Sequence, residues 1–170
     1  MSVDHGVMFA SPRSLRPTLL ERSLAFGSAI LLVFVLAAII RGHSHWRQAS
    51  LLIWLHLATL LIAIALTPVL LLRPRGVRRH RQLGYAWVVA MILTSALSFG
   101  IQTINPGGFS AIHVLSTITM LATPTVAWHA HRHRVQAHRT TAISLIAAAL
   151  LIAGFFTFPF SRMLGRWLFA

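Results

Sequence analysis

Four histidines near the ends of apolar segments form two pairs when they are sorted by their expected depth in a membrane. His56 pairs with His113, and His80 pairs with His138. Histidine inside a membrane segment is rare and usually functional. Two imidazoles at matching depth on facing helices are the axial ligands that a b-type haem needs from its protein. The pattern therefore predicts one or two haem b groups, with these four histidines as the iron ligands.

The first pair lies within hydrocarbon. His56 lies about seven residues into its apolar segment, hence about 10 Å deep, and His113 lies about five residues into its own, hence about 7 Å deep, at 1.5 Å per residue. The alternative to iron ligation is a neutral imidazole bonded to a hydroxyl group of a neighbouring helix, such as that of Thr59 or Ser116. Such bonds contribute only about 0.6 kcal/mol on average. Ligation and hydrogen bonding both stay open at this stage.

The second pair lies at the start of two apolar segments, and each histidine is followed by an arginine, Arg81 after His80 and Arg139 after His138. Arginine suits haem propionates because it forms bidentate, charge-assisted hydrogen bonds with carboxylates. Gly84 follows His80 by one turn and would leave room for a flat macrocycle, as small residues do where helices approach closely. The alternative is a pair of ordinary interfacial histidines beside arginines that extend toward water.

Other chemistry finds little support. The segment His129–His138 alternates histidine with arginine. Histidine clusters can bind Zn, Cu or Ni, but fixed positive charge disfavours a bound cation, so a solvated basic loop is the favoured interpretation and a metal path through the helices is the weakest. The chain has no cysteine, and Asp4 and Glu21 are its only acidic residues. Thiol catalysis and paired-carboxylate hydrolysis are therefore excluded, and whether the protein is an enzyme stays open.

Composition places the chain in a membrane. Of its 170 residues, 56% are hydrophobic and 10% are charged, whereas soluble domains carry about 25% charged residues. The formal net charge is +13, but the arginines cluster at the flanks of apolar segments, as they do in membrane proteins. We therefore expect anionic lipid headgroups of the bilayer as partners, and no nucleic acid.

Five apolar segments approach the roughly 20 residues that a bilayer requires of a helix. They are Leu24–Ile40, Ala49–Leu72, Leu83–Thr103, Phe109–Trp128 and Thr140–Phe160. Asn105-Pro-Gly-Gly108 is a strong turn signal between the third and fourth segments. The expected fold is all-α, with five transmembrane helices of which the last four form an antiparallel bundle. Residues 1–23 would be a cytoplasmic N-terminal tail, and residues 24–170 a single transmembrane domain.

Arginine counts predict the orientation. One side of the membrane would hold eleven arginines and the other only four. The larger set is Arg13, Arg16, Arg22, Arg73, Arg75, Arg78, Arg79, Arg81, Arg132, Arg134 and Arg139; the smaller is Arg41, Arg47, Arg162 and Arg166. Because cytoplasmic loops carry the excess of positive charge, we expect a multi-pass protein of the bacterial inner membrane, with a cytoplasmic N-terminus and a periplasmic C-terminus.

Several stretches carry a resemblance to a known family. They are His56-Leu-Ala-Thr with Pro68, His80-Arg-Gln-Leu-Gly84-Tyr-Ala-Trp, Phe109-Ser-Ala-Ile-His113-Val-Leu-Ser, Ala137-His138-Arg139, and Gly154-Phe-Phe-Thr-Phe-Pro159 with Arg162 and Leu164-Gly165-Arg166. Over roughly three-quarters of its length the chain resembles a family of predicted bacterial membrane proteins of unknown function (domain of unknown function twenty-three-oh-six). The resemblance implies fold and membrane localisation rather than an activity.

A second likeness is architectural. Di-haem transmembrane cytochromes b also take one histidine from each of four consecutive helices, with alternate helices paired. The likeness implies a membrane-embedded b-type haem protein that passes electrons between a quinone or small reductant and an acceptor. The alternative is a non-catalytic integral membrane protein or a subunit of a larger membrane complex, whose histidines are helix–helix hydrogen-bond partners. A membrane-protein partner or a homodimer is compatible with either function.

Overall fold

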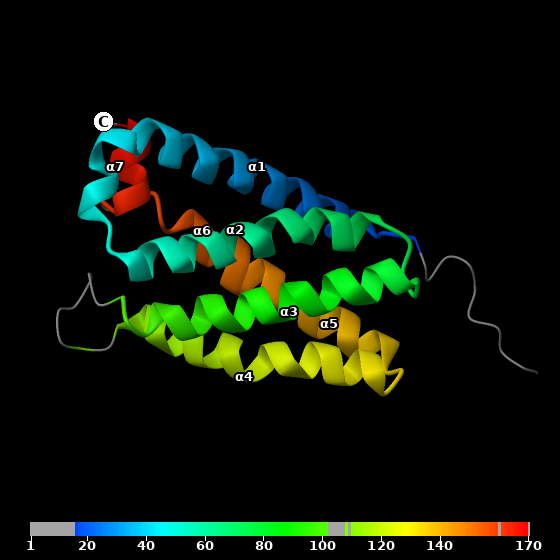
Figure 1. Ribbon diagram of the computed structural model, residues 1–170. Helices are drawn as coiled ribbons and strands as arrows, with labels where there is room; N and C mark the ends of the chain where they lie inside the picture. Colours follow the sequence, from blue (N-terminus) through cyan, green and yellow to red (C-terminus); the bar gives the residue numbers. More distant parts are fainter. Residues whose placement is uncertain (1–15, 102–107, 109, 160, 170) are drawn as a thin grey trace, which may run out of the picture.

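The computed structural model describes residues 16–101, 108, 110–159 and 161–169, and within these residues the regular structure is entirely helical (Figure 1). The elements are α1 (Leu19–Arg41), the 3₁₀ helix η2 (Gly42–Gln48), α2 (Leu51–Leu72), α3 (Arg78–Ser98), α4 (Ala111–His131), α5 (Val135–Leu145), the π-helix η3 (Ile146–Ile152), α6 (Ala153–Phe155) and α7 (Met163–Phe169). The all-α prediction is confirmed.

Four helical segments are long and apolar enough to cross a membrane. They are Leu19–Gln48, which joins α1 to η2, then α2, then α4, and Val135–Phe155, which runs through α5, η3 and α6. They make the protein a multi-pass membrane protein by length and composition. The third predicted segment corresponds to α3, which has 21 residues but begins with Arg78, Arg79 and Arg81 and does not belong to this set.

Short polar segments begin the helices. Thr18 precedes α1, and its side chain accepts a hydrogen bond from the N–H of Glu21 while the Glu21 carboxylate accepts from the N–H of Thr18. This reciprocal capping box satisfies two N–H groups that a helix start otherwise leaves unpaired. Ser50 caps α2 in a similar way through the N–H of Ile53. Because of these caps, α1 begins five residues before the predicted apolar segment at Leu24.

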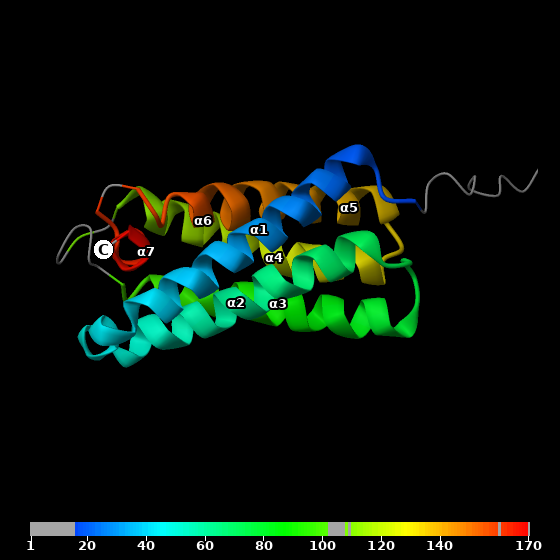
Figure 2. The ribbon, with the colours of Figure 1, turned by 90° about the horizontal axis from the view of Figure 1, so that it is seen from above.

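Consecutive helices lie side by side (Figures 1 and 2). α2 packs against α1 and α3, and α4 packs against α3 and α5. In Figure 1 the starts of α1, α3 and α5 lie at the same end of the molecule as the ends of α2 and α4. We call this the arginine end, because Arg75, Arg79 and Arg139 lie there. At the opposite end, α7 packs against α1 and η2.

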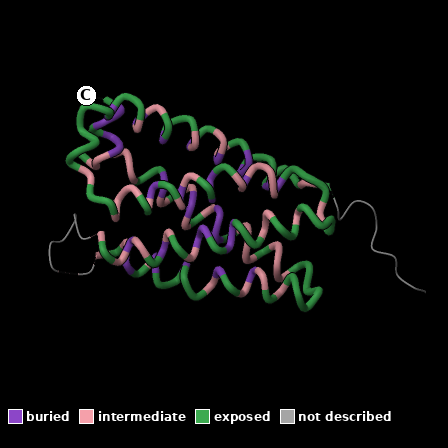
Figure 3. Tube along the Cα trace, in the orientation of Figure 1, coloured by how far each residue is buried: buried purple, intermediate pink, exposed green. Residues whose placement is uncertain are grey.

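Burial follows the pattern of a membrane protein. Side chains such as Ile64 and Leu150 are completely buried between the helices, and Figure 3 shows the buried positions along the inner sides of the helices. The outer surfaces carry large apolar side chains, with Val33 exposed by 65% and Leu121 by 72%. Exposed apolar surface of this extent marks an interaction with another apolar phase, and lipid is that phase for a multi-pass protein.

Some ends of the predicted segments lie outside the described residues, and the last segment contains an interruption that was not predicted. The ends of the predicted segments at Thr103, Phe109 and Phe160 and the turn residues 105–107 lie outside the described residues. The last predicted segment is interrupted by the π-helix η3, which sequence periodicity does not reveal. π-Helical turns are rare and occur often at functional sites. His80 and His138 lie inside the first turns of α3 and α5 rather than just before them.

Candidate functional site

His56 bonds to the neighbouring helix through one ring nitrogen. Its Nδ1 lies 3.0 Å from the carbonyl oxygen of Thr94 in α3. A carbonyl oxygen can only accept, so Nδ1 carries the proton, and in a neutral ring Nε2 then carries the lone pair. A histidine that ligates a metal through Nε2 typically shows this arrangement, because its other N–H group donates to a carbonyl or carboxylate.

His113, the expected partner of His56, is held in the opposite arrangement. The side chain is 3% exposed, and its Nδ1 accepts a hydrogen bond of 3.0 Å from the backbone N–H of Ser110. Nδ1 is therefore the unprotonated nitrogen, and a neutral ring carries its proton on Nε2. Nε2 could ligate iron only after it lost this proton. In a neutral ring the proton would then be on Nδ1, which could no longer accept the hydrogen bond from the N–H of Ser110. The ring of Phe99 lies beside it, with centroids 6.0 Å apart.

A small hollow lies beside His56 within the helices. Its volume is about 80 Å³, and its lining includes Thr94, Ser116 and Thr157 with parts of η3 and α6. His113 is not part of this lining. Hydroxyl groups link the surrounding helices: Thr94 donates to Thr59 at 2.8 Å, and the hydroxyls of Ser98 and Ser116 lie 2.5 Å apart. Pockets that hold drug-sized ligands measure about 300–1,000 Å³, so a macrocycle would enter only if these helices separated.

The second pair, His80 and His138, lies in the first turns of α3 and α5. Nδ1 of His138 lies 2.9 Å from the carbonyl oxygen of Val126 in α4, which leaves the Nε2 lone pair available by the argument used for His56. Nδ1 of His80 is buried and has no hydrogen-bond partner among the described residues. Burial lowers the pKa of His80 below its ordinary value of 6.5, and the nearby charges of His138 and then Arg75 lower it further. His80 and His138 are thus within electrostatic reach of each other.

The three residues that we expected to contact a haem beside this pair have different surroundings. Gly84 faces open space, because a Cβ atom built on it would have no neighbour within 4 Å. Arg81 is exposed. Arg139, which we expected near a haem propionate, instead binds the carboxylate of Glu21 in bidentate fashion, with Nε to Oε1 at 2.7 Å and one terminal nitrogen to Oε2 at 2.8 Å.

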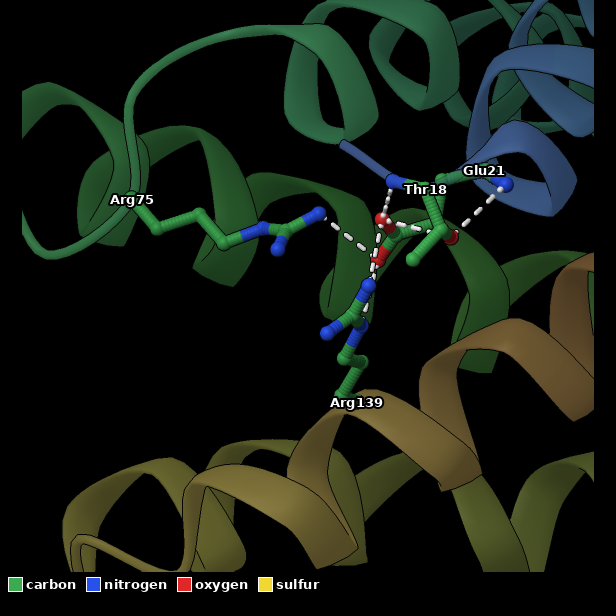
Figure 4. Close-up of polar contacts among 4 residues, drawn as sticks. All are labelled: Thr18, Glu21, Arg75 and Arg139. Atoms are coloured by element: carbon green, nitrogen blue, oxygen red, sulfur yellow. Dashed lines mark hydrogen bonds and ion pairs between the residues drawn. The ribbon is translucent and has the colours of Figure 1, made fainter. Parts of the chain in front are cut away.

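Glu21 is the centre of a buried ion cluster that the sequence analysis did not single out (Figure 4). The side chain is 1% exposed. Besides Arg139, a terminal nitrogen of Arg75 lies 2.6 Å from Oε1, and the N–H of Thr18 donates to Oε2 at 2.7 Å. The cluster joins α1 to α5 and to the segment between α2 and α3. Two signals could have revealed it: the Thr18-x-x-Glu21 capping box, and a single acid facing many arginines.

The His129–His138 segment forms no metal centre among the residues that the structure describes, since no group of three or more potential ligands converges there. Two of its arginines, Arg132 and Arg134, lie over the ring of Trp128. The guanidinium carbons of Arg132 and Arg134 lie 5.8 Å and 5.3 Å from the centre of the Trp128 ring, which is a cation–π distance. His133 adopts a left-handed backbone conformation, with φ of 54°.

In comparisons with known proteins, no family model matched this chain, and neither a similar curated protein nor a similar solved structure was found. The resemblances described above therefore stay predictions. Inferences about function depend on the side-chain geometry.

Proposed function

We propose that this protein is an integral membrane protein that binds b-type haem and passes electrons between a quinone or small reductant and an acceptor. The observation that carries the proposal is the distance of 2.9 Å between Nδ1 of His138 and the carbonyl oxygen of Val126. Its Nδ1–H is engaged by the Val126 carbonyl, so Nε2 is ready to donate its lone pair to iron. His80, within electrostatic reach and with its own buried Nδ1, is the second ligand of this inner site.

The residues present fit the inner site better than the outer one. Two imidazoles and an exposed Arg81 for a propionate suit a haem at the first turns of α3 and α5, and a side-chain atom added at Gly84 would meet no neighbour within 4 Å. At the outer site His56 has the required tautomer, but His113 does not while Ser110 donates to its Nδ1. A haem there would also need far more room than the hollow of about 80 Å³ beside His56. We therefore propose one haem at the inner pair, and a second only if the bond between Ser110 and His113 breaks.

A bound haem would supply iron that alternates between its ferric and ferrous states by one electron. The chain would contribute imidazole ligands, a low-dielectric setting and positive charge. Fixed positive charge from Arg81 and its neighbours favours the reduced form, which carries one positive charge less. Arg139 remains bound to Glu21 and would hold α5, and hence His138, in place.

The proposal includes the arrangement in the membrane. We propose that α3 also crosses the bilayer as a fifth span, that α2 to α6 form an antiparallel bundle, and that the arginine end faces the cytoplasm of a bacterium by the positive-inside rule. The hydrocarbon part of α3 would then begin near Leu83, after the arginines of its first turn.

A visible spectrum of the protein tests the haem. The protein is expressed in a bacterial host supplied with a haem precursor, purified in mild detergent, and measured oxidised and reduced. We expect a Soret band and sharp reduced bands of bis-imidazole haem. His138→Ala and His80→Ala should lose them, and His131→Ala, at the exposed last residue of α4, should keep them. Colourless wild-type protein under these conditions would refute the proposal.

A second function is favoured by a specific observation. The imidazoles of His56 and His138 donate to backbone carbonyls of neighbouring helices. This is what the non-catalytic alternative requires, in which histidines join the helices of a scaffold or complex subunit. Colourless protein that co-purifies with other membrane subunits after cross-linking would support this alternative.

A further inference from the structure

A second hollow lies at the arginine end, where α2 is joined to α3. Its volume is about 160 Å³, and it lies between the last turn of α2, the connection that follows, and the first turns of α3. The polar side chains that line it are Arg73, Arg79 and His80. The remaining lining residues are Val69, Pro74, Val77 and Leu83.

The charge of this hollow is uncompensated. Glu21 is the one acidic side chain among the residues that the structure describes, and Arg75 and Arg139 already bind it. Arg73 and Arg79 make no ion pair within the described part of the chain. Arg73 and Arg79 border a hollow whose lining is mostly apolar, and both side chains are exposed. With no acid paired to them they can attract an anion to the hollow, and guanidinium groups suit phosphate in particular through paired hydrogen bonds.

Two further groups are available for such an anion. The buried Nδ1 of His80 has no hydrogen-bond partner among the described residues. No side chain caps the start of α3 at Val77, and the first N–H groups of a helix have no partner within the helix. A phosphate in the hollow would satisfy both the imidazole and the helix start, in the manner of anions at helix N-termini.

We propose that this hollow binds the phosphate group of an anionic phospholipid of the surrounding leaflet. The apolar part of the lining favours a lipid over free phosphate, because Val69, Val77 and Leu83 would border the first carbons of the lipid. The hollow also lies where the apolar run of α2 ends, at Leu72, which is 44% exposed. A ligand there must have a charged head at the interface and a tail along the helices. The site shares His80 with the proposed haem site, but its two arginines are not among the proposed haem-binding residues.

Native mass spectrometry of the detergent-purified protein tests the site with phosphatidylglycerol and, for comparison, phosphatidylcholine of the same chains. We expect phosphatidylglycerol to bind the wild type with clear preference. The double variant R73Q/R79Q should bind it about twenty-fivefold more weakly, since each of the two basic residues near an anionic surface contributes roughly a factor of five. The variant R73K/R79K, which keeps the charge, should retain most of the binding.

The matched control is R132Q/R134Q, which removes the same charge from the same end of the molecule but away from the hollow. Its affinity for phosphatidylglycerol should stay within about twofold of the wild type, because the general field of the arginines is screened by salt. Equal loss in both double variants, or equal binding of the two lipids, would overturn the proposal. Displacement of the lipid by excess inorganic phosphate would also overturn it, because free phosphate would then be the occupant.

The readout distinguishes this site from the haem proposal. Lipid binding is measured by mass on protein with or without a chromophore, and R73Q/R79Q should leave the haem spectrum unchanged. Lost lipid preference with an intact spectrum would refute the lipid site alone. Normal lipid preference in colourless protein would refute the haem alone.

Discussion

The two ends of the molecule are held together by different kinds of interaction. At the arginine end, the buried carboxylate of Glu21 joins three segments through Arg75 and Arg139. At the opposite end, the ring of Trp54 lies between those of Trp46 and Trp167, with centroid distances of 5.4 Å and 6.1 Å. The two ends therefore differ in how their helices are joined. At the arginine end one acid binds arginines from two other segments, and at the opposite end aromatic rings pack against one another.

Small residues complete the contrast at the aromatic end. A Cβ atom on Gly42 would overlap the ring of Trp167, and one on Gly165 would overlap the backbone carbonyl of Phe158. These contacts bring α7 against η2 and the end of α1. In the ion cluster, by comparison, Arg75 and Arg139 remain about one-fifth exposed, at 18% and 22%. The aromatic end depends on shape and the arginine end on charge.

Removal of the carboxylate should have the largest effect on stability. We expect Glu21→Gln to lower the free energy of unfolding in detergent by about 3 kcal/mol, because it leaves two partly buried guanidinium groups without their anion. Thermal unfolding followed by circular dichroism measures the change. Arg22→Gln, at an exposed neighbouring position, is the control and should change little.

A double variant checks that Glu21 acts through its arginines. E21Q/R139Q should cost less than the sum of the two single variants, because partners in one network are not additive. Additive costs, or a loss below about 1 kcal/mol for Glu21→Gln, would contradict the view that a buried ion cluster holds this end.

At the aromatic end, Gly165→Ala should cost about 1–3 kcal/mol, the usual cost of overpacking. The reason is that the obstructing atom is a backbone carbonyl, which cannot rotate away. Gly84→Ala is the matched control. It lies in the helical part of α3 with open space around it, so alanine should stabilise it by up to about 1 kcal/mol. Equal effects of the two substitutions would show that α7 is not held by shape.

A smaller effect separates the two roles of His56. If its imidazole only joins α2 to α3, His56→Leu should cost about 0.6 kcal/mol, the average for a hydrogen bond between membrane helices. The haem spectrum should be unchanged, since we propose the inner pair as the iron ligands. His131→Leu, at an exposed position, serves as the control. Loss of the chromophore in His56→Leu would instead restore the outer pair as the haem site.

The smallest effect concerns pH at the arginine end. The folded protein holds the pKa of His80 below 6.5, chiefly through burial and further through His138 and Arg75. The unfolded state therefore binds the proton first, so the contribution of neutral His80 is complete above pH 6.5 and is lost as the pH falls through its folded pKa. Melting temperatures should fall on acidification, and His80→Gln should reduce that fall. An unchanged slope in the variant would exclude His80 as its source.

Most of the helices could be predicted from the sequence, but the side-chain hydrogen bonds and ion pairs between them could not. The helical class and four of the spans follow from runs of apolar residues such as Leu51–Leu72, because helix formation in lipid depends on local composition. The roles of His113 and Arg139 could not be predicted in this way. Ser110 next to the start of α4 sets the tautomer of His113, and Glu21, distant in sequence, takes up Arg139.

By itself, therefore, the sequence determined that this is a helical membrane protein with its positive charge concentrated at one end. It also placed histidines at two depths. Only the tertiary structure decided which ring nitrogen of His56, His113 and His138 carries the proton, and which arginine is already bound to an acid. The physical reason is the range of the interactions: hydrophobic length and charge are read along one segment, whereas a proton's position depends on the neighbouring atom that accepts or donates the bond, and for His56 and His138 that atom belongs to another helix.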